Sequence, residues 1–209
     1  MKNSIKIFSY KGTPVYLKYW IVLLPLFFSI FESLAIVISV LVHELAHTHK
    51  AHKLGYKTEY VFVNLLVGGA LVDQKHLENY KHSIKIAFAG PLSNIKLALL
   101  SAIISIPLLL YTDFGEKLFH FFFYFSFINL LIAFFNLLPI FPLDGGRISK
   151  GIFNLYINDK DKSRKLSSIL SLITSLILIY VSLIYSLWIL LIVFIILFII
   201  SILDYKNRI

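Results

Sequence analysis

The sequence predicts an all-α polytopic membrane protein with six transmembrane helices. A small β-hairpin or sheet that dips into the membrane is expected between the second and third helices. The chain has 209 residues, of which 58% are hydrophobic and only 15% are charged. Its apolar runs recur at the length of a membrane span, and the basic residues lie between these runs. A soluble domain of this size needs more polar surface, so we expect one membrane-embedded domain over residues 1–209.

The spans follow from the apolar runs, because about 20 apolar residues cross a hydrocarbon core of about 30 Å. One helix from Tyr19 to Lys53 would measure about 52 Å. We therefore expect a tight hairpin near Glu32. The long run 166–203 contains neither Gly nor Pro, so we divide it near Tyr185 on length alone. The expected spans are about 17–31, 34–53, 84–111, 117–138, 166–184 and 187–203.

Two segments have β-like sequences. Residues 1–18 are short and basic with a turn signal after Lys11, and they predict an amphipathic strand or an interfacial segment. Residues 58–72 are rich in β-branched and aromatic residues and are interrupted by Gly68 and Gly69, which predicts a hairpin. This hairpin is too apolar for a solvated loop, so we place it against protein at membrane depth.

The formal net charge of +9 suggests nucleic acid as a partner, but the distribution of charge argues against it. The segments 1–18, 48–85, 145–165 and 204–209 hold 18 of the 20 Lys and Arg residues. This positive-inside pattern predicts a multi-pass protein of the cell membrane with both termini in the cytoplasm. The chain has no Cys, which excludes disulfides and thiolate metal ligands.

The segment from Leu41 to His47 carries the chemistry. His43 and His47 are four residues apart, so on a helix they lie on one face and can ligate one Zn²⁺. Glu44 stands beside them as a general base that can take a proton from water.

A catalytic zinc site needs three protein ligands and one open position. Asp144 is the predicted third ligand, because it follows two helix-breaking prolines at the end of the fourth span. The expected cofactor is one Zn²⁺ per chain. A bound dication also explains ionisable side chains beside apolar runs, where each carboxylate costs about 2.5–3.5 kcal/mol. The alternative for Asp144 is the N-cap of the helix that follows it.

Three stretches together resemble the site-2 protease family of intramembrane zinc metalloproteases, in particular its compact branch with the stage IV sporulation protease. They are 43–47 (HELAH), 89–94 (AGPLSN) and 136–145 (NLLPIFPLDG). The resemblance implies a metalloendopeptidase that performs regulated intramembrane proteolysis. The implied substrate is a membrane-embedded or membrane-attached protein, and a membrane-bound inhibitor or regulator is a further expected partner besides the lipid bilayer.

The resemblance also suggests substrate contacts. Asn136 and Asn94 would touch the substrate backbone, and the hairpin with Gly68 and Gly69 would bind an unwound substrate segment as an added strand. Each has a structural alternative. Asn136 can bond a carbonyl of the broken helix, Asn94 can link two helices, and the glycines can simply form a turn. His49 is expected to point away from the metal.

One rival function belongs to another class. A membrane metal-ion transporter could use the His and Glu side chains of the second span to carry zinc. Such a protein should have ligand-bearing residues along several spans. The fifth and sixth spans carry no Asp, Glu, Lys, Arg or His between residues 166 and 203. We therefore favour the protease.

Overall fold

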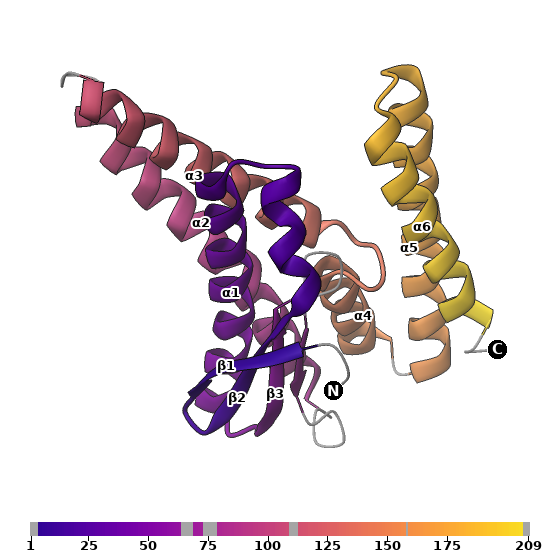
Figure 1. Cartoon of the computed structure of the whole chain (residues 1–209). Helices are drawn as coiled ribbons and strands as arrows, with labels where there is room; N and C mark the ends of the chain where they lie inside the picture. Colours follow the sequence, from indigo (N-terminus) through magenta and orange to yellow (C-terminus); the bar gives the residue numbers. More distant parts are fainter. Residues whose placement is uncertain (1–3, 64–68, 73–78, 109–112, 158, 207–209) are drawn as a thin grey trace. The chain divides into compact units, whose positions relative to one another are not determined.

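The computed structural model describes residues 4–63, 69–72, 79–108, 113–157 and 159–206 (Figure 1). The chain divides into two compact units, 1–76 with 89–134, and 77–88 with 135–209. We call them the first and the second unit and describe each by itself.

Five helices in the described part of the chain are long and apolar enough to cross a membrane. Many of their large apolar side chains are exposed, among them Ile103 at 66% and Ile189 at 80%. Such surfaces are stable when they face lipid, and the chain is an integral membrane protein. The five helices are α1 (Ile30–Lys53), α2 (Tyr80–Leu108), α3 (Asp113–Leu137), α5 (Lys160–Ile184) and α6 (Trp188–Lys206).

The predicted first span over 17–31 is not a long helix. The chain forms a strand, β2 (Thr13–Lys18), then a 3-10 helix, η1 (Tyr19–Leu26), and α1 begins at Ile30. Pro25 lies inside η1, where its missing N–H and its ring oppose a continuous α-helix. The chain turns between Leu26 and Ile30, just before Glu32 and thus close to the predicted position. Ser29 caps α1, and its side chain and that of Glu32 bond each other's backbone N–H.

A four-stranded sheet with the order β1-β2-β3-β4 lies in the first unit. β1 (Ser4–Tyr10) and β2 form a hairpin whose turn residues, Lys11 and Gly12, both have positive φ. β2 then pairs in parallel with β3 (Thr58–Val63), and β3 pairs antiparallel with β4 (Gly69–Val72). The predicted pairing of strands within residues 58–72 is confirmed, and the N-terminal hairpin extends the sheet. The predicted depth of these strands in the membrane stays a prediction. Gly68 lies outside the described residues.

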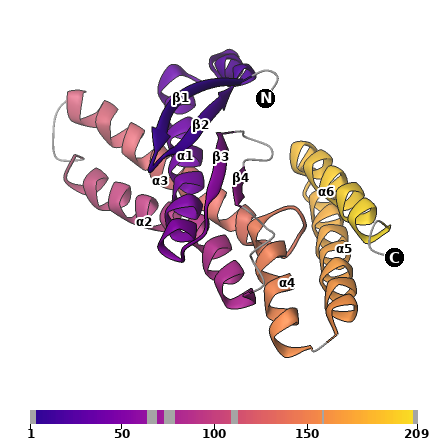
Figure 2. The same cartoon turned by 90° about the horizontal axis from the view of Figure 1, so that it is seen from below.

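The sheet and η1 pack against α1 (Figure 2). Their shared core contains Val15, Val61 and Val63 from the strands, Ile21 and Leu24 from η1, and Ile36 from α1.

Two polar contacts extend the sheet's packing to the C-terminal end of α1. The hydroxyl of Tyr10 lies 2.7 Å from His49 Nδ1, and that of Thr13 lies 3.3 Å from His52 Nε2. These histidines therefore lie on the sheet-facing side of α1 and hydrogen bond to the N-terminal hairpin.

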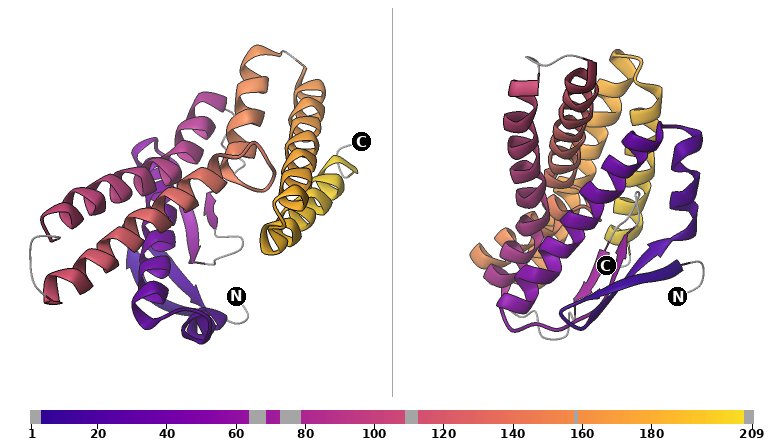
Figure 3. Two further views of the ribbon diagram at one scale, coloured as in Figure 1. Left: turned by 90° about the horizontal axis from the view of Figure 1, so that it is seen from above. Right: turned by 60° about the vertical axis from the view of Figure 1, so that its left-hand side comes forward.

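In the second unit, α5 and α6 run side by side as a helical hairpin (Figure 3). The break falls where length predicted it, with Tyr185 as the C-cap of α5 and Ser186 at φ +54°. Ser171 of α5 accepts a hydrogen bond from the Phe141 N–H at 2.9 Å, and Ser201 of α6 donates to the Phe141 carbonyl at 3.4 Å. Both helices thus hold the loop that leads into α4 (Asp144–Tyr156).

Candidate metal centre

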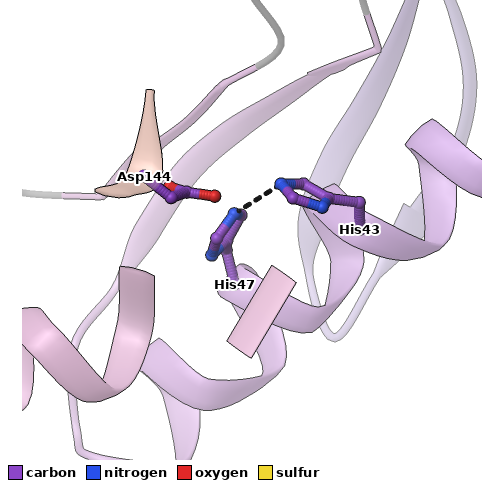
Figure 4. A group of neighbouring side chains, drawn as sticks. All are labelled: His43, His47 and Asp144. Carbon is purple, nitrogen blue, oxygen red and sulfur yellow. Dashed lines mark hydrogen bonds between the residues drawn. The ribbon is translucent and has the colours of Figure 1, made fainter. Parts of the chain in front are cut away.

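The two candidate histidine ligands lie one turn apart on α1, and both are 4% exposed. Their Nε2 atoms are 3.1 Å apart, and the rings meet at 83° (Figure 4). Nitrogen ligands that bind zinc at about 2.0–2.1 Å with tetrahedral angles lie about 3.3 Å from each other. The separation of the two nitrogens therefore fits one shared zinc ion.

Gly90 of α2 makes room for the two imidazoles. A Cβ atom at this position would lie 2.4 Å from His47 Nε2 and 2.6 Å from His43 Nε2. A side chain here would therefore fill the space beside both nitrogens. The backbone of α2 can approach the histidines only because residue 90 has no side chain.

The other ring nitrogen of His43 is also engaged. His43 Nδ1 lies 2.5 Å from Asn94 Oδ1, and Asn94 is 0% exposed. Both N–H groups of the Asn94 amide are donated inside the protein, to the Ser39 carbonyl and to Asn129 Oδ1. This arrangement fits the helix-linking alternative for Asn94. Its predicted contact with substrate stays a prediction.

Asp144 is the first residue of α4 and is 6% exposed. The N-cap is Leu143, with no side-chain cap bond, so the N-cap interpretation of Asp144 is wrong. A carboxylate in the first turn is favoured by the helix dipole. The Arg147 guanidinium lies 3.5 Å from Asp144 Oδ1 and adds positive charge. The start of α4 and Arg147 therefore both place positive charge beside the Asp144 carboxylate.

Two glycines let the start of α4 pack onto the preceding loop. A Cβ at Gly145 would lie 2.2 Å from the Leu138 carbonyl oxygen, and one at Gly146 would lie 2.7 Å from that of Ile140. Backbone atoms cannot move aside as a flexible side chain can. The glycines after Asp144 therefore set the position of its helix.

The remaining predicted site residues lie on three elements. Glu44 is 4% exposed on α1, next to His43. Asn136 is half-buried in the last turn of α3, and Gly69 begins β4 opposite Phe62.

No role was predicted from the sequence for three residues at or near this centre: Gly90, Ser39 and Asn129. For Ser39 and Asn129 the available signal was a polar side chain within an apolar run, since buried polar groups in a membrane are costly and often functional. For Gly90 the signal was its place in the stretch 89–94 that carries the family resemblance.

The comparisons with known proteins agree with this geometry. A sequence model of Peptidase family M50 matches residues 31–117 and 111–181. A zinc metalloprotease of Methanocaldococcus jannaschii is 32% identical over 168 residues, which is 74% of this chain and 47% of that protein. Stage IV sporulation protein FB of Bacillus subtilis is 32% identical over 115 residues, 55% of this chain and 38% of that protein.

Among solved structures, the site-2 protease from Methanocaldococcus jannaschii superposes with a TM-score of 0.67 at 25% identity. The match covers 97% of this chain and 95% of that one. The chain spans about half or less of the length of the two curated relatives described above. The family model covers most of the chain and includes the two histidines and Asp144. The chain therefore belongs to Peptidase family M50.

Proposed function

We propose that this protein is an intramembrane zinc metalloprotease. It hydrolyses a peptide bond in or next to a transmembrane segment of a membrane-bound protein substrate. The observation that carries the proposal is a group of three buried side chains, His43, His47 and Asp144, that could hold one metal ion with one atom from each. One relative is named a zinc metalloprotease and one solved structure a site-2 protease, and both names support zinc-dependent hydrolysis of a peptide bond.

The residues present fit zinc, since two imidazoles and one carboxylate are a typical catalytic ligand set with one position open. Zinc, when bound, supplies Lewis acidity and lowers the pKa of a coordinated water to about 7. Glu44 accepts a proton from the attacking water and donates it to the leaving amine. The two histidines are the proposed ligands from α1, and Asp144 is the proposed ligand from α4.

Substrate enters as an extended segment in this proposal. A peptide bond within a helix is shielded by its own hydrogen bonds, so the segment must unwind before hydrolysis. β1 and β4 are the edge strands of the sheet, and an edge strand can pair with an added strand. We assign this role to β4, where Gly69 allows close approach of a backbone, and to the preceding Gly68. Asn136, half-buried at the end of α3, is proposed to bond the substrate backbone.

The N-terminal segment is the proposed first of six crossings. β2 and η1 together measure about 36 Å, at about 3.3 Å per strand residue and 2.0 Å per 3-10 residue. The 24 residues of α1 also measure about 36 Å. Thr13 bonds His52 near one end of α1, and Ser29 caps its other end. The segment therefore runs back along α1 (Figure 3). Together with the five long helices it would make six crossings, and the positive-inside pattern then supports the proposal that both chain termini are cytoplasmic.

The absence of cysteines makes this topology easy to test. Lys6 and Lys117 are both exposed and lie on opposite sides in the proposed topology. We expect a thiol reagent that cannot cross membranes to label Lys117→Cys in intact cells. It should label Lys6→Cys only after the cells are permeabilised. Labelling of Lys6→Cys in intact cells would contradict a cytoplasmic N-terminus.

A vesicle assay tests the proposed function against the transporter alternative. The purified protein is reconstituted with candidate single-span substrates, treated with a zinc chelator and then given zinc again. We expect cleavage to stop on chelation and to return with zinc, and we expect no uptake of zinc into the vesicles. Zinc uptake without cleavage of any candidate would favour the transporter.

A further inference from the structure

Three apolar helices of the first unit each contribute a polar side chain to one network: Ser39 from α1, Asn94 from α2 and Asn129 from α3. All three are 0% exposed. Asn129 Nδ2 donates to Ser39 Oγ at 2.8 Å, and Asn94 Nδ2 donates to Asn129 Oδ1 at 2.6 Å. The network ends at His43, whose Nδ1 lies 2.5 Å from Asn94 Oδ1.

Backbone carbonyls determine the direction of these hydrogen bonds, because a carbonyl oxygen can only accept. Asn129 Nδ2 donates to the Phe125 carbonyl at 2.8 Å, and Asn94 Nδ2 donates to the Ser39 carbonyl at 3.2 Å. Ser39 Oγ donates to the Ala35 carbonyl at 2.7 Å. The amide nitrogens of Asn129 and Asn94 therefore face backbone carbonyls, which assigns the other amide atom of each as oxygen. The oxygen of Asn129 faces the amide of Asn94, and the oxygen of Asn94 faces His43.

This direction has a consequence for His43. Because the oxygen of Asn94 faces the ring, the Nδ1 atom must be the donor. A neutral imidazole carries one proton, so Nε2 is then the unprotonated nitrogen, and it lies 3.1 Å from His47 Nε2. Turning either amide over would set oxygen against oxygen or N–H against N–H, at a large cost in an apolar interior.

We propose that Asn129 is a positioning residue for the metal centre. Asn129 acts through Asn94 to keep the proton of His43 on Nδ1, which leaves Nε2 ready to bind the metal. Residues that orient a metal-binding imidazole through its second nitrogen commonly change metal affinity or activity 10–100-fold. The inference rests on the proposed function in treating His43 as a zinc ligand. The fixed tautomer itself does not depend on zinc.

Asn129→Leu tests the proposal, since leucine has a similar volume but cannot accept the bond from Asn94. The first measurement is the zinc dissociation constant of the full-length protein in detergent, by competition with a chelator. We expect Asn129→Leu to weaken zinc binding at least tenfold. The second is the ¹⁵N NMR spectrum of histidine-labelled, zinc-free protein, with the His43 signals assigned by their loss in His43→Gln. We expect one Nδ1–H tautomer in the wild type and a mixture in Asn129→Leu.

Two further variants separate positioning from packing. Ser126→Ala removes another buried bond between α3 and α2, from Ser126 Oγ to the Ala98 carbonyl at 2.8 Å. It should leave zinc affinity and the His43 tautomer unchanged. Asn129→Asp, when protonated, keeps an acceptor for Asn94 and one donor, and should restore affinity to within threefold of the wild type. If Asn129→Leu does not fold, Ser39→Ala removes the bond that orients the other side of the Asn129 amide.

The outcomes separate the proposed function from the positioning role of Asn129. A wild type that binds no zinc would contradict the proposed function, while a single Nδ1–H tautomer would still support the network. A wild type that binds zinc, with Asn129→Leu binding equally well and showing the same His43 spectrum, would overturn only the positioning role. Equal losses in Asn129→Leu and Ser126→Ala would also overturn it, because packing alone would then explain both.

Discussion

Glu44→Gln should reduce cleavage at least a hundredfold while zinc remains bound. Glutamine has nearly the shape of glutamate, but its amide cannot accept a proton from water at neutral pH. General acid–base catalysis by one side chain is typically worth 10²–10⁴-fold in rate. Glu44 is not a proposed metal ligand, so its replacement leaves His43 and His47 in place. The measurements are the rate of substrate cleavage in vesicles and the zinc content of the purified variant.

Glu32→Gln is the matched control. It makes the same change in the same helix, at a half-buried position of the capping box, where glutamine is equally suitable. We expect wild-type cleavage and zinc content. Substantial cleavage by Glu44→Gln would refute the assignment of Glu44 as the general base. A loss of zinc from this variant would instead make Glu44 a ligand.

Asp144→Ala should remove both zinc and activity. The change deletes one of three proposed ligands, so zinc affinity should fall by more than the 10–100-fold typical of losing an outer partner. Zinc content after dialysis against a weak chelator and cleavage in vesicles should both approach background.

Asp161→Ala controls for the loss of a first-turn aspartate. Asp161 lies in the first turn of α5 and pairs with Arg164 at 3.4 Å, as Asp144 pairs with Arg147 in α4. Asp161 is exposed, so its replacement should change neither zinc content nor cleavage. Unchanged zinc stoichiometry in Asp144→Ala would remove Asp144 from the ligand set.

The long helices could be predicted from the sequence because each is a run of apolar residues longer than the hydrocarbon core is thick. Length alone even located the break at Tyr185 and Ser186. The His43 and His47 pair could be predicted because helical periodicity places residues four apart on one face. Asp144 could be predicted as a candidate ligand because two prolines end the preceding helix.

The N-terminal crossing could not be predicted in the same way. Residues 17–31 are apolar enough for a helix, but Pro25 and the pairing of β2 with β3 decide their conformation. Strand pairing depends on a segment about 45 residues further along the chain, which local periodicity does not reveal. The roles of Gly90 and Asn129 could not be predicted from the sequence for a related reason. A single glycine or amide in an apolar run carries no spacing pattern, and its role appears only when helices pack.

Zinc-edge X-ray absorption of Asp144→His, compared with the zinc-loaded wild type, tests most directly whether His43, His47 and Asp144 share one zinc ion. Imidazole rings give a characteristic scattering pattern, so the spectrum counts them. We predict two imidazoles and oxygen ligands at about 2.0–2.1 Å in the wild type. In Asp144→His we predict three imidazoles on the same ion. A count of two imidazoles in both proteins, at equal zinc occupancy, would contradict the ligand set.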